Sequence, residues 1–279
     1  MYTTSREMIR KAKQNGYAVP AFNAEDLEMI QAIISACEEM KSPVIIQTTP
    51  STLKYMRTFE ASAIVKALAE RTGIPVSLHL DHGSSYELCR QALEDGYSSI
   101  MIDGSKLSLD ENIELTARVV KLADTYGVPV EGELGTIGGK EDSLEGEVQY
   151  TRPEEAVRFE KETGVAMFAA AIGTKHGFYK GEPHLNFELL EEINRRVSVP
   201  VVLHGGSGIP DDMIRRAVNT GIAKLNVATE LRYAATQAVR KALLDESVID
   251  PKKFMGPARD AVRELCMEKI KLCGSEGKA

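Results

Sequence analysis

The sequence has no tryptophan and contains only four cysteines and five histidines among 279 residues. The cysteines form no CxxC pair, so a disulfide framework is not indicated and a reduced, cytoplasmic setting is expected. The N-terminal residues contain neither the apolar segment nor the cleavage site of a secretory signal. No run approaches the roughly 20 apolar residues that a membrane span requires. We therefore expect a cytoplasmic protein with no membrane partner.

An excess of basic residues is also missing, because 34 Lys and Arg face 41 Asp and Glu and give a formal net charge of -7. Proteins that bind nucleic acids or anionic membranes in general present a basic face. No nucleic-acid partner is expected, although local positive groups can still bind a small anion. The hydrophobic fraction of 43% and the charged fraction of 27% are ordinary for a soluble globular protein.

Short apolar runs alternate with longer amphipathic segments along the whole chain. Eight runs rich in Val, Ile and Ala predict strands at residues 18–22, 43–49, 75–80, 98–102, 128–133, 166–172, 200–204 and 223–227. Their near-continuous hydrophobicity is typical of parallel strands that are buried on both faces. Helices are predicted between and after them at residues 27–40, 60–71, 86–95, 110–126, 153–163, 187–197, 211–220 and 230–244.

This eightfold strand–helix alternation predicts an α/β protein with a (β/α)8 TIM barrel. No low-complexity linker interrupts the chain, so residues 1–279 are expected to form one domain, with extra terminal helices at about 4–15 and 256–272. The alternative is a doubly wound open sheet. Such a sheet would place a GxGxxG turn after its first strand, whereas residues 23–26 (NAED) contain no glycine.

Polar side chains occur at the expected C-terminal end of every strand, where TIM barrels carry their active sites. His82, His176 and His204 follow the third, sixth and seventh strands. Three imidazoles with an open fourth position are typical of a catalytic zinc site. Asp103 and Glu133 end the fourth and fifth strands, where they are expected to bind a second metal or to orient the histidines. An ordinary hydrogen-bond network is the alternative for this pair.

Two further segments suggest ligand binding. Glycines at 205, 206 and 208 surround Ser207 after the seventh strand, and Asn226 and Thr229 follow the eighth. Backbone N–H groups in such a loop and at a helix N-terminus favour a phosphate at this part of a barrel.

The segment 132–150 is too long for a simple strand–helix turn and predicts a mobile lid. Glu141 in this lid is a candidate general base that meets the substrate on closure. A solvated acidic loop is the alternative.

The motifs together resemble those of the class II, metal-dependent ketose-bisphosphate aldolases over nearly the whole chain. The resemblance rests on residues 19–23 (VPAFN), 79–83 (HLDHG), 101–105 (MIDGS), 131–142 (EGELGTIGGKED), 169–183 (AAAIGTKHGFYKGEP), 202–211 (VLHGGSGIPD), 224–231 (KLNVATEL) and 273–279 (CGSEGKA). It implies a TIM barrel with one catalytic Zn²⁺ on His82, His176 and His204. It also associates Asp103 and Glu133 with a second divalent position, and a monovalent cation with the phosphate.

The resemblance also assigns roles in the reaction. Asp81 is implied as the proton donor to the aldehyde oxygen, and Glu141 as the residue that exchanges the proton at the nucleophilic carbon. The phosphorylated sugar and its product dihydroxyacetone phosphate are expected to contact Asn23, Thr49, Gly177, Lys180, Gly205, Gly206, Ser207, Asn226, Ala228 and Thr229.

One part of the chain departs from the longer branch of this family. Ala228 stands where that branch has Asp, and the branch's arginine for the far phosphate is not matched. Arg259 or a residue of a neighbouring subunit is expected to replace it. Residues 226–230 (NVATE) resemble the tagatose-bisphosphate members instead.

The expected activity is reversible, zinc-dependent cleavage of fructose or tagatose 1,6-bisphosphate to dihydroxyacetone phosphate and glyceraldehyde 3-phosphate. Breaking the C3–C4 bond leaves a carbanion, which a Lewis acid stabilises as an enediolate by several kcal/mol. The alternatives are an aldolase for another ketose phosphate, a TIM-barrel metal hydrolase and a non-catalytic sugar-phosphate-binding module. We expect a homo-oligomer, either a dimer or a tetramer.

Overall fold

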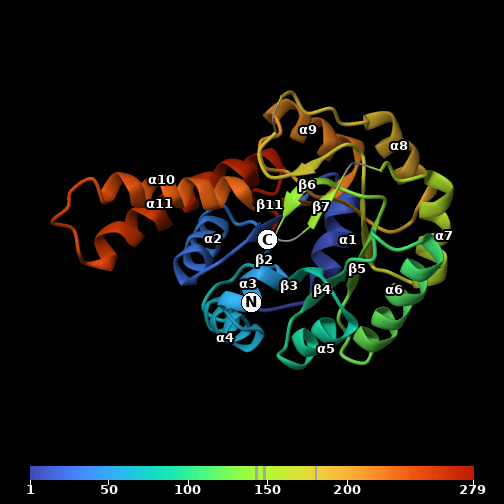
Figure 1. Cartoon of the computed structure of the whole chain (residues 1–279), viewed down its shortest axis with the longest axis horizontal. Coiled ribbons are helices and arrows are strands. Elements are labelled where there is room, and N and C mark those ends of the chain that lie inside the picture. Colours follow the sequence, from blue (N-terminus) through green and yellow to red (C-terminus); the bar gives the residue numbers. More distant parts are fainter. Residues whose placement is uncertain (142–143, 147–148, 180) are drawn as a thin grey trace.

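The computed structural model describes residues 1–141, 144–146, 149–179 and 181–279, with 139–141 and 144–146 described by backbone alone. Eight parallel strands close into a barrel in the order β1-β11-β10-β8-β5-β4-β3-β2 (Figure 1). They are β1 (Val19–Asn23), β2 (Val44–Thr48), β3 (Val76–Gly83), β4 (Ser99–Ile102), β5 (Val130–Leu134), β8 (Met167–Ala170), β10 (Val201–Leu203) and β11 (Ile222–Val227). The predicted TIM barrel is therefore confirmed.

Helices surround the barrel and follow its strands. They are α2 (Leu27–Glu39), α4 (Thr58–Ala69), α5 (Tyr86–Glu94), α6 (Leu109–Asp124), α7 (Pro153–Thr163), α8 (Phe187–Arg196), α9 (Asp211–Thr220) and α10 (Thr229–Ala242). Side chains begin several of them: Asp26, Ser85 and Ser108 each accept a hydrogen bond from a backbone N–H of the first turn. A short helix, α3 (Pro50–Tyr55), was not predicted; it begins because Thr49 caps it and Pro50 suits its first position.

The interior of the barrel is divided into an apolar layer and a polar layer. Val19, Ala21 and Ile45 belong to a small inner cluster, which residues of α1 (Ser5–Asn15) join at the N-terminal end of the barrel. Two residues beyond Ala21 and Ile45 on the same faces, Asn23 and Gln47 are buried polar residues. The outer faces of the strands pack on the helices in a much larger apolar cluster. The polar layer therefore lies at the C-terminal end, as the sequence predicts for the active site.

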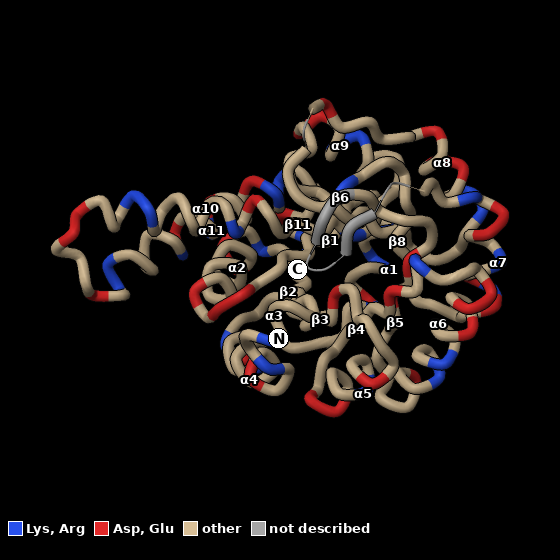
Figure 2. The backbone as a smooth tube through the Cα atoms, in the orientation of Figure 1, with Lys and Arg blue, Asp and Glu red and all other residues tan. Residues whose placement is uncertain are grey.

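Near the C-terminus, α10 and α11 (Pro251–Leu272) form a two-helix arm that extends away from the barrel (Figure 1). The second helix starts at Pro251, earlier than the expected residue 256, because Asp250 caps it and Pro257 is tolerated inside it. Lys, Arg, Asp and Glu are interspersed along the outer helices (Figure 2). None of the helices in the described part of the chain has the length and apolar composition that a membrane span requires.

The segment 132–150 contains a hairpin of β6 (Gly138–Glu141) and β7 (Leu144–Gly146). The short strand β9 (Lys175–His176) pairs in parallel with β6 and completes a three-stranded sheet outside the barrel. The sequence predicted a mobile lid for this segment and gave no indication of these strands. Strands of two to four residues are too short to show a period in the sequence.

Candidate active site

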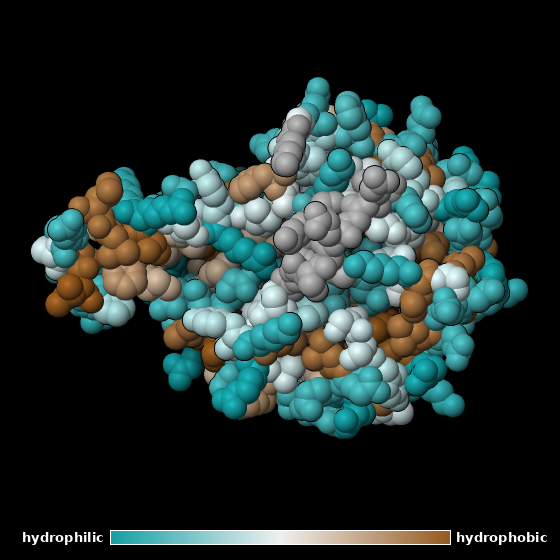
Figure 3. Space-filling model, viewed as in Figure 1, coloured by the Kyte–Doolittle hydropathy of each residue, from teal (hydrophilic) through white to brown (hydrophobic). Residues whose placement is uncertain are grey.

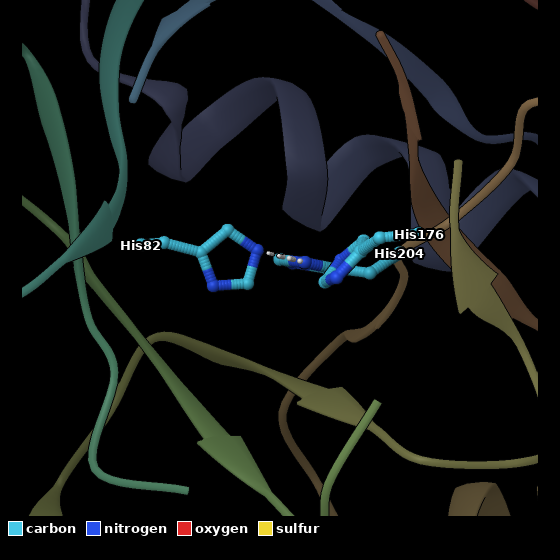
Figure 4. A group of neighbouring side chains, drawn as sticks. All are labelled: His82, His176 and His204. Atoms are coloured by element: carbon cyan, nitrogen blue, oxygen red, sulfur yellow. Dashed lines mark hydrogen bonds between the residues drawn. The ribbon is translucent and has the colours of Figure 1, made fainter. Parts of the chain in front are cut away.

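Three buried histidines converge at the C-terminal end of the barrel (Figure 4). His82 lies near the end of β3, His176 ends β9, and His204 directly follows β10. Their ring centroids are 5.0 Å apart for His82 and His176 and 4.9 Å apart for His82 and His204. One nitrogen from each ring lies within 4.8 Å of the others. The backbone of His82 has φ 48°, a left-handed conformation that non-glycine residues rarely adopt and that often marks functional positions.

Carboxylates hold two of these rings from their outer sides. His82 Nδ1 lies 2.8 Å from Asp103 Oδ2, and His204 Nε2 lies 2.7 Å from Glu131 Oε1. With the ring proton on each outer nitrogen, the inner nitrogens His82 Nε2 and His204 Nδ1 face each other at 3.1 Å. Lone pairs of neutral imidazoles aimed at one point are the donor set of a zinc site, so the residues present fit a metal ion.

The electrostatics of the cluster also favour a cation. Burial, with the nearby His82 adding to it, holds the pKa values of His176 and His204 well below the usual range. Burial also acts to lower the pKa of His82, but Asp81, Asp103 and Glu133 outweigh it and raise that pKa well above its usual value. Burial, and next to it the charge of Asp103, raises the pKa of Glu133. Without a metal the carboxylates therefore favour a proton on His82, and the same negative charges would favour a cation bound to the neutral ring.

Metal-free protein is expected to lose stability steeply as the pH falls from about 7 to 5. Burial lowers the pKa values of His79, His176 and His204 in the fold, whereas unfolded histidine titrates near 6.5. The unfolded state then binds more protons, at a loss on the order of 1 kcal/mol per imidazole and pH unit. The raised pKa of His82 acts in the opposite direction. Its contribution to the stability of the fold is complete below about pH 6.5 and is lost as the pH rises through the pKa that His82 has in the folded protein. This contribution offsets part of the loss from the other histidines. Thermal unfolding of chelator-treated protein measures the effect, and a melting temperature that is constant over this range would contradict it.

Asp81 lies beside this cluster and is held by three side-chain amides. Asn23 Nδ2 donates to Asp81 Oδ2 at 3.0 Å, Gln47 Nε2 to the same oxygen at 3.3 Å, and Asn226 Nδ2 to Asp81 Oδ1 at 3.3 Å. Gln47 also donates to Asn23 Oδ1 at 2.9 Å, which fixes both amides. The carboxylate of Asp81 is therefore oriented by donors from three strands, next to His82, which follows it in the sequence.

The glycine-rich loop after β10 is shaped by close contacts. Gly205 has φ 66°, and a Cβ there would lie 2.5 Å from the carbonyl oxygen of Lys175. The Tyr179 hydroxyl donates to the carbonyl of Gly205 at 3.1 Å and accepts from the N–H of Lys175 at 2.9 Å. Only glycine fits at this position, and the tyrosine ties the loop to β9.

The same loop also organises the start of α10. The residue before this helix is Ala228, which has no side chain to cap it. The hydroxyl of Ser207 instead accepts from the N–H groups of Ala228 and Glu230, both at 3.3 Å, and Glu230 Oε1 accepts from the N–H of Gly208 at 3.0 Å. A helix N-terminus beside a glycine-rich loop is a favourable site for a phosphate.

One cavity joins these parts of the site. Its lining residues are Asn23, Asp81, His176, Gly177, Gly205, Gly206, Ser207, Asn226, Ala228 and Thr229. His176 of the histidine cluster, the carboxylate of Asp81 and the glycine-rich loop therefore face one shared space.

A family model described as "Fructose-bisphosphate aldolase class-II" matches residues 3–278. The chain belongs to this family. A protein of Bacillus subtilis (strain 168) named "Probable fructose-bisphosphate aldolase" is 45% identical over 278 residues, which cover 98% of each chain. A "6-phospho-5-dehydro-2-deoxy-D-gluconate aldolase" of Bacillus licheniformis is 45% identical over 282 residues, covering 100% of this chain and 97% of that protein.

The solved structures include an aldolase with the same barrel. The YdjI aldolase from Escherichia coli K12 superposes with a TM-score of 0.90 at 39% sequence identity, and each chain is covered completely. The fold and the aldolase family inferred from the sequence motifs are thereby confirmed.

Most of the substrate residues predicted for this aldolase family member line the shared cavity, but some do not. Thr49 is fully buried as the cap of α3 and is not among the lining residues. Arg259 lies on α11, where it contacts Gln31 of α2 at 3.4 Å, away from the cavity. Lys180 and the side chain of Glu141 lie outside the described residues.

Sequence reasoning assigned no role to two charged residues inside the barrel. Glu131 on β5 and Lys224 on β11 form a completely buried ion pair at 2.8 Å. Lys224 lies within the predicted strand at residues 223–227. The sequence did contain a signal for this pair, since a lysine within an apolar strand that also contains Asn226 is unusual.

Proposed function

We propose that this aldolase cleaves a ketose 1,6-bisphosphate, fructose or tagatose, to dihydroxyacetone phosphate and glyceraldehyde 3-phosphate in a zinc-dependent reaction. The observation that carries the proposal is the single cavity onto which His176, Asp81 and the loop of Gly205 to Ser207 all open. A phosphate held by that loop places the adjoining carbons of the sugar beside the carboxylate and the histidines.

His82, His176 and His204 would hold the catalytic ion through nitrogens that lie within 4.8 Å of one another. Bound there, a divalent ion supplies Lewis-acid stabilisation of the negative charge that develops on the dihydroxyacetone phosphate half. Asp103 holds His82 in place through its 2.8 Å hydrogen bond. An ion held by three histidines would keep the capacity to bind an oxygen of the substrate.

Asp81 would move the proton of the C4 hydroxyl. Its amide partners Asn23, Gln47 and Asn226 keep both carboxylate oxygens oriented. The N–H groups of the loop and of α10 would bind the phosphate, and this remote binding free energy positions the reacting carbon. Glu141, whose role is implied by the resemblance of its loop to that of the aldolase family, would exchange the proton at the nucleophilic carbon.

Asp103 and Glu133 would supply carboxylate oxygens to a second divalent position beside His82, since these three residues form another group with ligand atoms within 4.8 Å, and Asp103 would then exchange its hydrogen bond with His82 for the ion. Glu133 Oε2 is buried without a hydrogen bond, as expected of an oxygen that can serve as a ligand. A monovalent cation near the phosphate would reduce the charge of the bound sugar.

The far half of the substrate is not specified by similarity. Two relatives that are each 45% identical to the chain carry names for different substrates, fructose bisphosphate and 6-phospho-5-dehydro-2-deoxy-D-gluconate. Both names imply a phosphorylated sugar. An aldolase for another ketose phosphate is therefore the second candidate function.

The deciding experiment is to incubate purified protein with fructose 1,6-bisphosphate, tagatose 1,6-bisphosphate or 6-phospho-5-dehydro-2-deoxy-D-gluconate. Formation of triose phosphate is then detected with and without a chelator. Chelation is expected to stop cleavage, and borohydride added with substrate is expected not to inactivate the enzyme. The buried Lys224 cannot meet a substrate to form an imine, because its ammonium is fully enclosed against Glu131. Inactivation by borohydride would contradict the proposal, and release of phosphate without triose phosphate would indicate a hydrolase.

Fructose and tagatose 1,6-bisphosphates are both expected to be cleaved, with less than about a hundredfold preference. They differ only in the configuration at C4, and the phosphate loop contacts the half that they share. Ala228 adds no charged contact, and a pocket without a dedicated hydrogen bond to one isomer discriminates by roughly 1–3 kcal/mol. Values of kcat/KM for both sugars test this, and a preference of several thousandfold would reveal a specific contact at the far half.

We also propose a cytoplasmic homo-oligomer, a dimer or a tetramer. The arm of α10 and α11 ends in apolar residues that are unusually open to solvent: Leu244 is 83% exposed and Ile249 88% (Figure 3). Exposed apolar tips of this kind are typical of protein interfaces. All four cysteines are free and buried, which suits a reducing compartment.

A further inference from the structure

A charged group lies in the middle of the barrel, beneath the histidine cluster. Glu131 and Lys224 are each 0% exposed, and Glu131 Oε2 lies 2.8 Å from Lys224 Nζ. The interiors of TIM barrels are usually filled by branched apolar side chains. A buried ion pair seldom stabilises a fold more than apolar residues of similar volume would. Stability alone therefore does not explain why this pair occupies the position.

The second oxygen of the same carboxylate points to a different group. Glu131 Oε1 lies 2.7 Å from His204 Nε2, while Oε2 is held by Lys224. His204 Nδ1 then faces His82 Nε2 at 3.1 Å, inside the cluster. A carboxylate with one oxygen fixed by a buried cation can turn little, so the imidazole bonded to its other oxygen is fixed as well.

A chain of hydrogen bonds leads from α1 to His79, which lies beside the carboxylate without a hydrogen bond to it. Ser5 of α1 lies 2.8 Å from the hydroxyl of Ser99, and that hydroxyl lies 2.7 Å from His79 Nδ1. His79 Nε2 lies 3.6 Å from Glu131 Oε2. The carboxylate is thus surrounded by Lys224, His79 and His204, and only the last of these belongs to the three-histidine group.

We propose that Glu131, anchored by Lys224, is a positioning residue that fixes the ring of His204 with Nδ1 toward the metal site and thereby sets the affinity for zinc. This inference rests on the proposed metal site. Groups that orient a metal-ligating histidine from behind typically change metal affinity 10–100-fold when they are removed. Neither Glu131 nor Lys224 is proposed to touch the substrate.

Two variants separate this role from a structural one. Glu131→Asp keeps the charge beside Lys224 but shortens the reach toward His204. Glu131→Gln combined with Lys224→Met removes both charges together, so that no ion is left buried without a partner. Ser5→Ala is the matched control, since it alters the same buried chain without contacting Glu131 or His204.

The measurement is the zinc affinity of each purified protein, by competition with a chromophoric chelator, together with the melting temperature of the metal-free form and the visible spectrum of the cobalt form. Both Glu131 variants are expected to bind zinc about 10–100-fold more weakly than the wild type and to show altered cobalt bands, while Ser5→Ala binds as the wild type does. Wild-type zinc affinity in either folded Glu131 variant, or an equal loss in Ser5→Ala, would overturn the inference. Failure of the wild-type protein itself to bind zinc would instead overturn the proposed function.

Discussion

Asp81→Ala is expected to lower kcat/KM for cleavage of the preferred ketose bisphosphate about a thousandfold. A positioned acid–base group typically contributes 10²–10⁴-fold, roughly 3–5 kcal/mol of transition-state stabilisation. Asp81 is suited to this role because three amides orient it and because it lines the cavity beside His176. Asp81→Asn, which preserves the shape of the side chain, is expected to lose nearly as much, since the amide cannot take up the proton.

The proper control for this loss is the metal content of the variant. Asp81 is one of the charges that raise the pKa of His82, so its removal can also weaken metal binding. Asp245→Ala, at the exposed tip of the arm, serves as the matched substitution and is expected to retain full activity. A zinc-loaded Asp81→Ala protein that cleaves at the wild-type rate would exclude the assigned role.

Glu141→Ala is expected to produce the complementary pattern. Exchange of the proton on dihydroxyacetone phosphate should become slow, because the proposed base is missing while the metal and phosphate sites remain. In Asp81→Ala the same exchange should persist better, because Asp81 is proposed to serve the aldehyde half of the reaction. Isotope exchange into dihydroxyacetone phosphate measures this step apart from cleavage. Equal losses of cleavage and of proton exchange in both variants would show that the two residues do not have separate roles.

The second large effect is expected from His176→Ala, which should reduce cleavage about a thousandfold or more together with loss of bound zinc. Two imidazoles hold zinc far more weakly than three, and the Lewis acid contributes several kcal/mol to the transition state. His176 also lines the cavity that it shares with Asp81, so its replacement changes the site directly. His184→Ala, an exposed histidine in the loop before α8, is the control and should retain both metal and activity.

The barrel could be predicted because each strand is a short apolar run followed by an amphipathic helix. The exact bounds of the helices and strands were predicted less well, because local capping residues decide them. Thr49 and Pro50 start α3 where the sequence pattern still indicated the end of a strand. The hairpin of β6 and β7 was missed because its strands are stabilised by pairing with β9, which is distant in the sequence.

The candidate site was predicted at the level of strand ends, which bring His82, His176 and His204 together from distant parts of the chain. The network behind them could not be predicted in the same way. Glu131 and Lys224 are 93 residues apart, and their pairing depends on which strand faces which across the closed barrel. The amides around Asp81 were likewise recognised in the sequence as polar residues at strand ends. That all three donate hydrogen bonds to the same carboxylate is apparent only in the folded structure.

One ion at the three-histidine site is expected to be required for cleavage. Titration of metal-free protein with zinc, followed by triose phosphate formation at each step, tests it most directly. Activity is predicted to be absent without metal, to rise in proportion to added zinc and to reach its plateau at about one equivalent per chain, the stoichiometry of a single catalytic site. Full cleavage activity in protein shown to be free of metal would contradict the account.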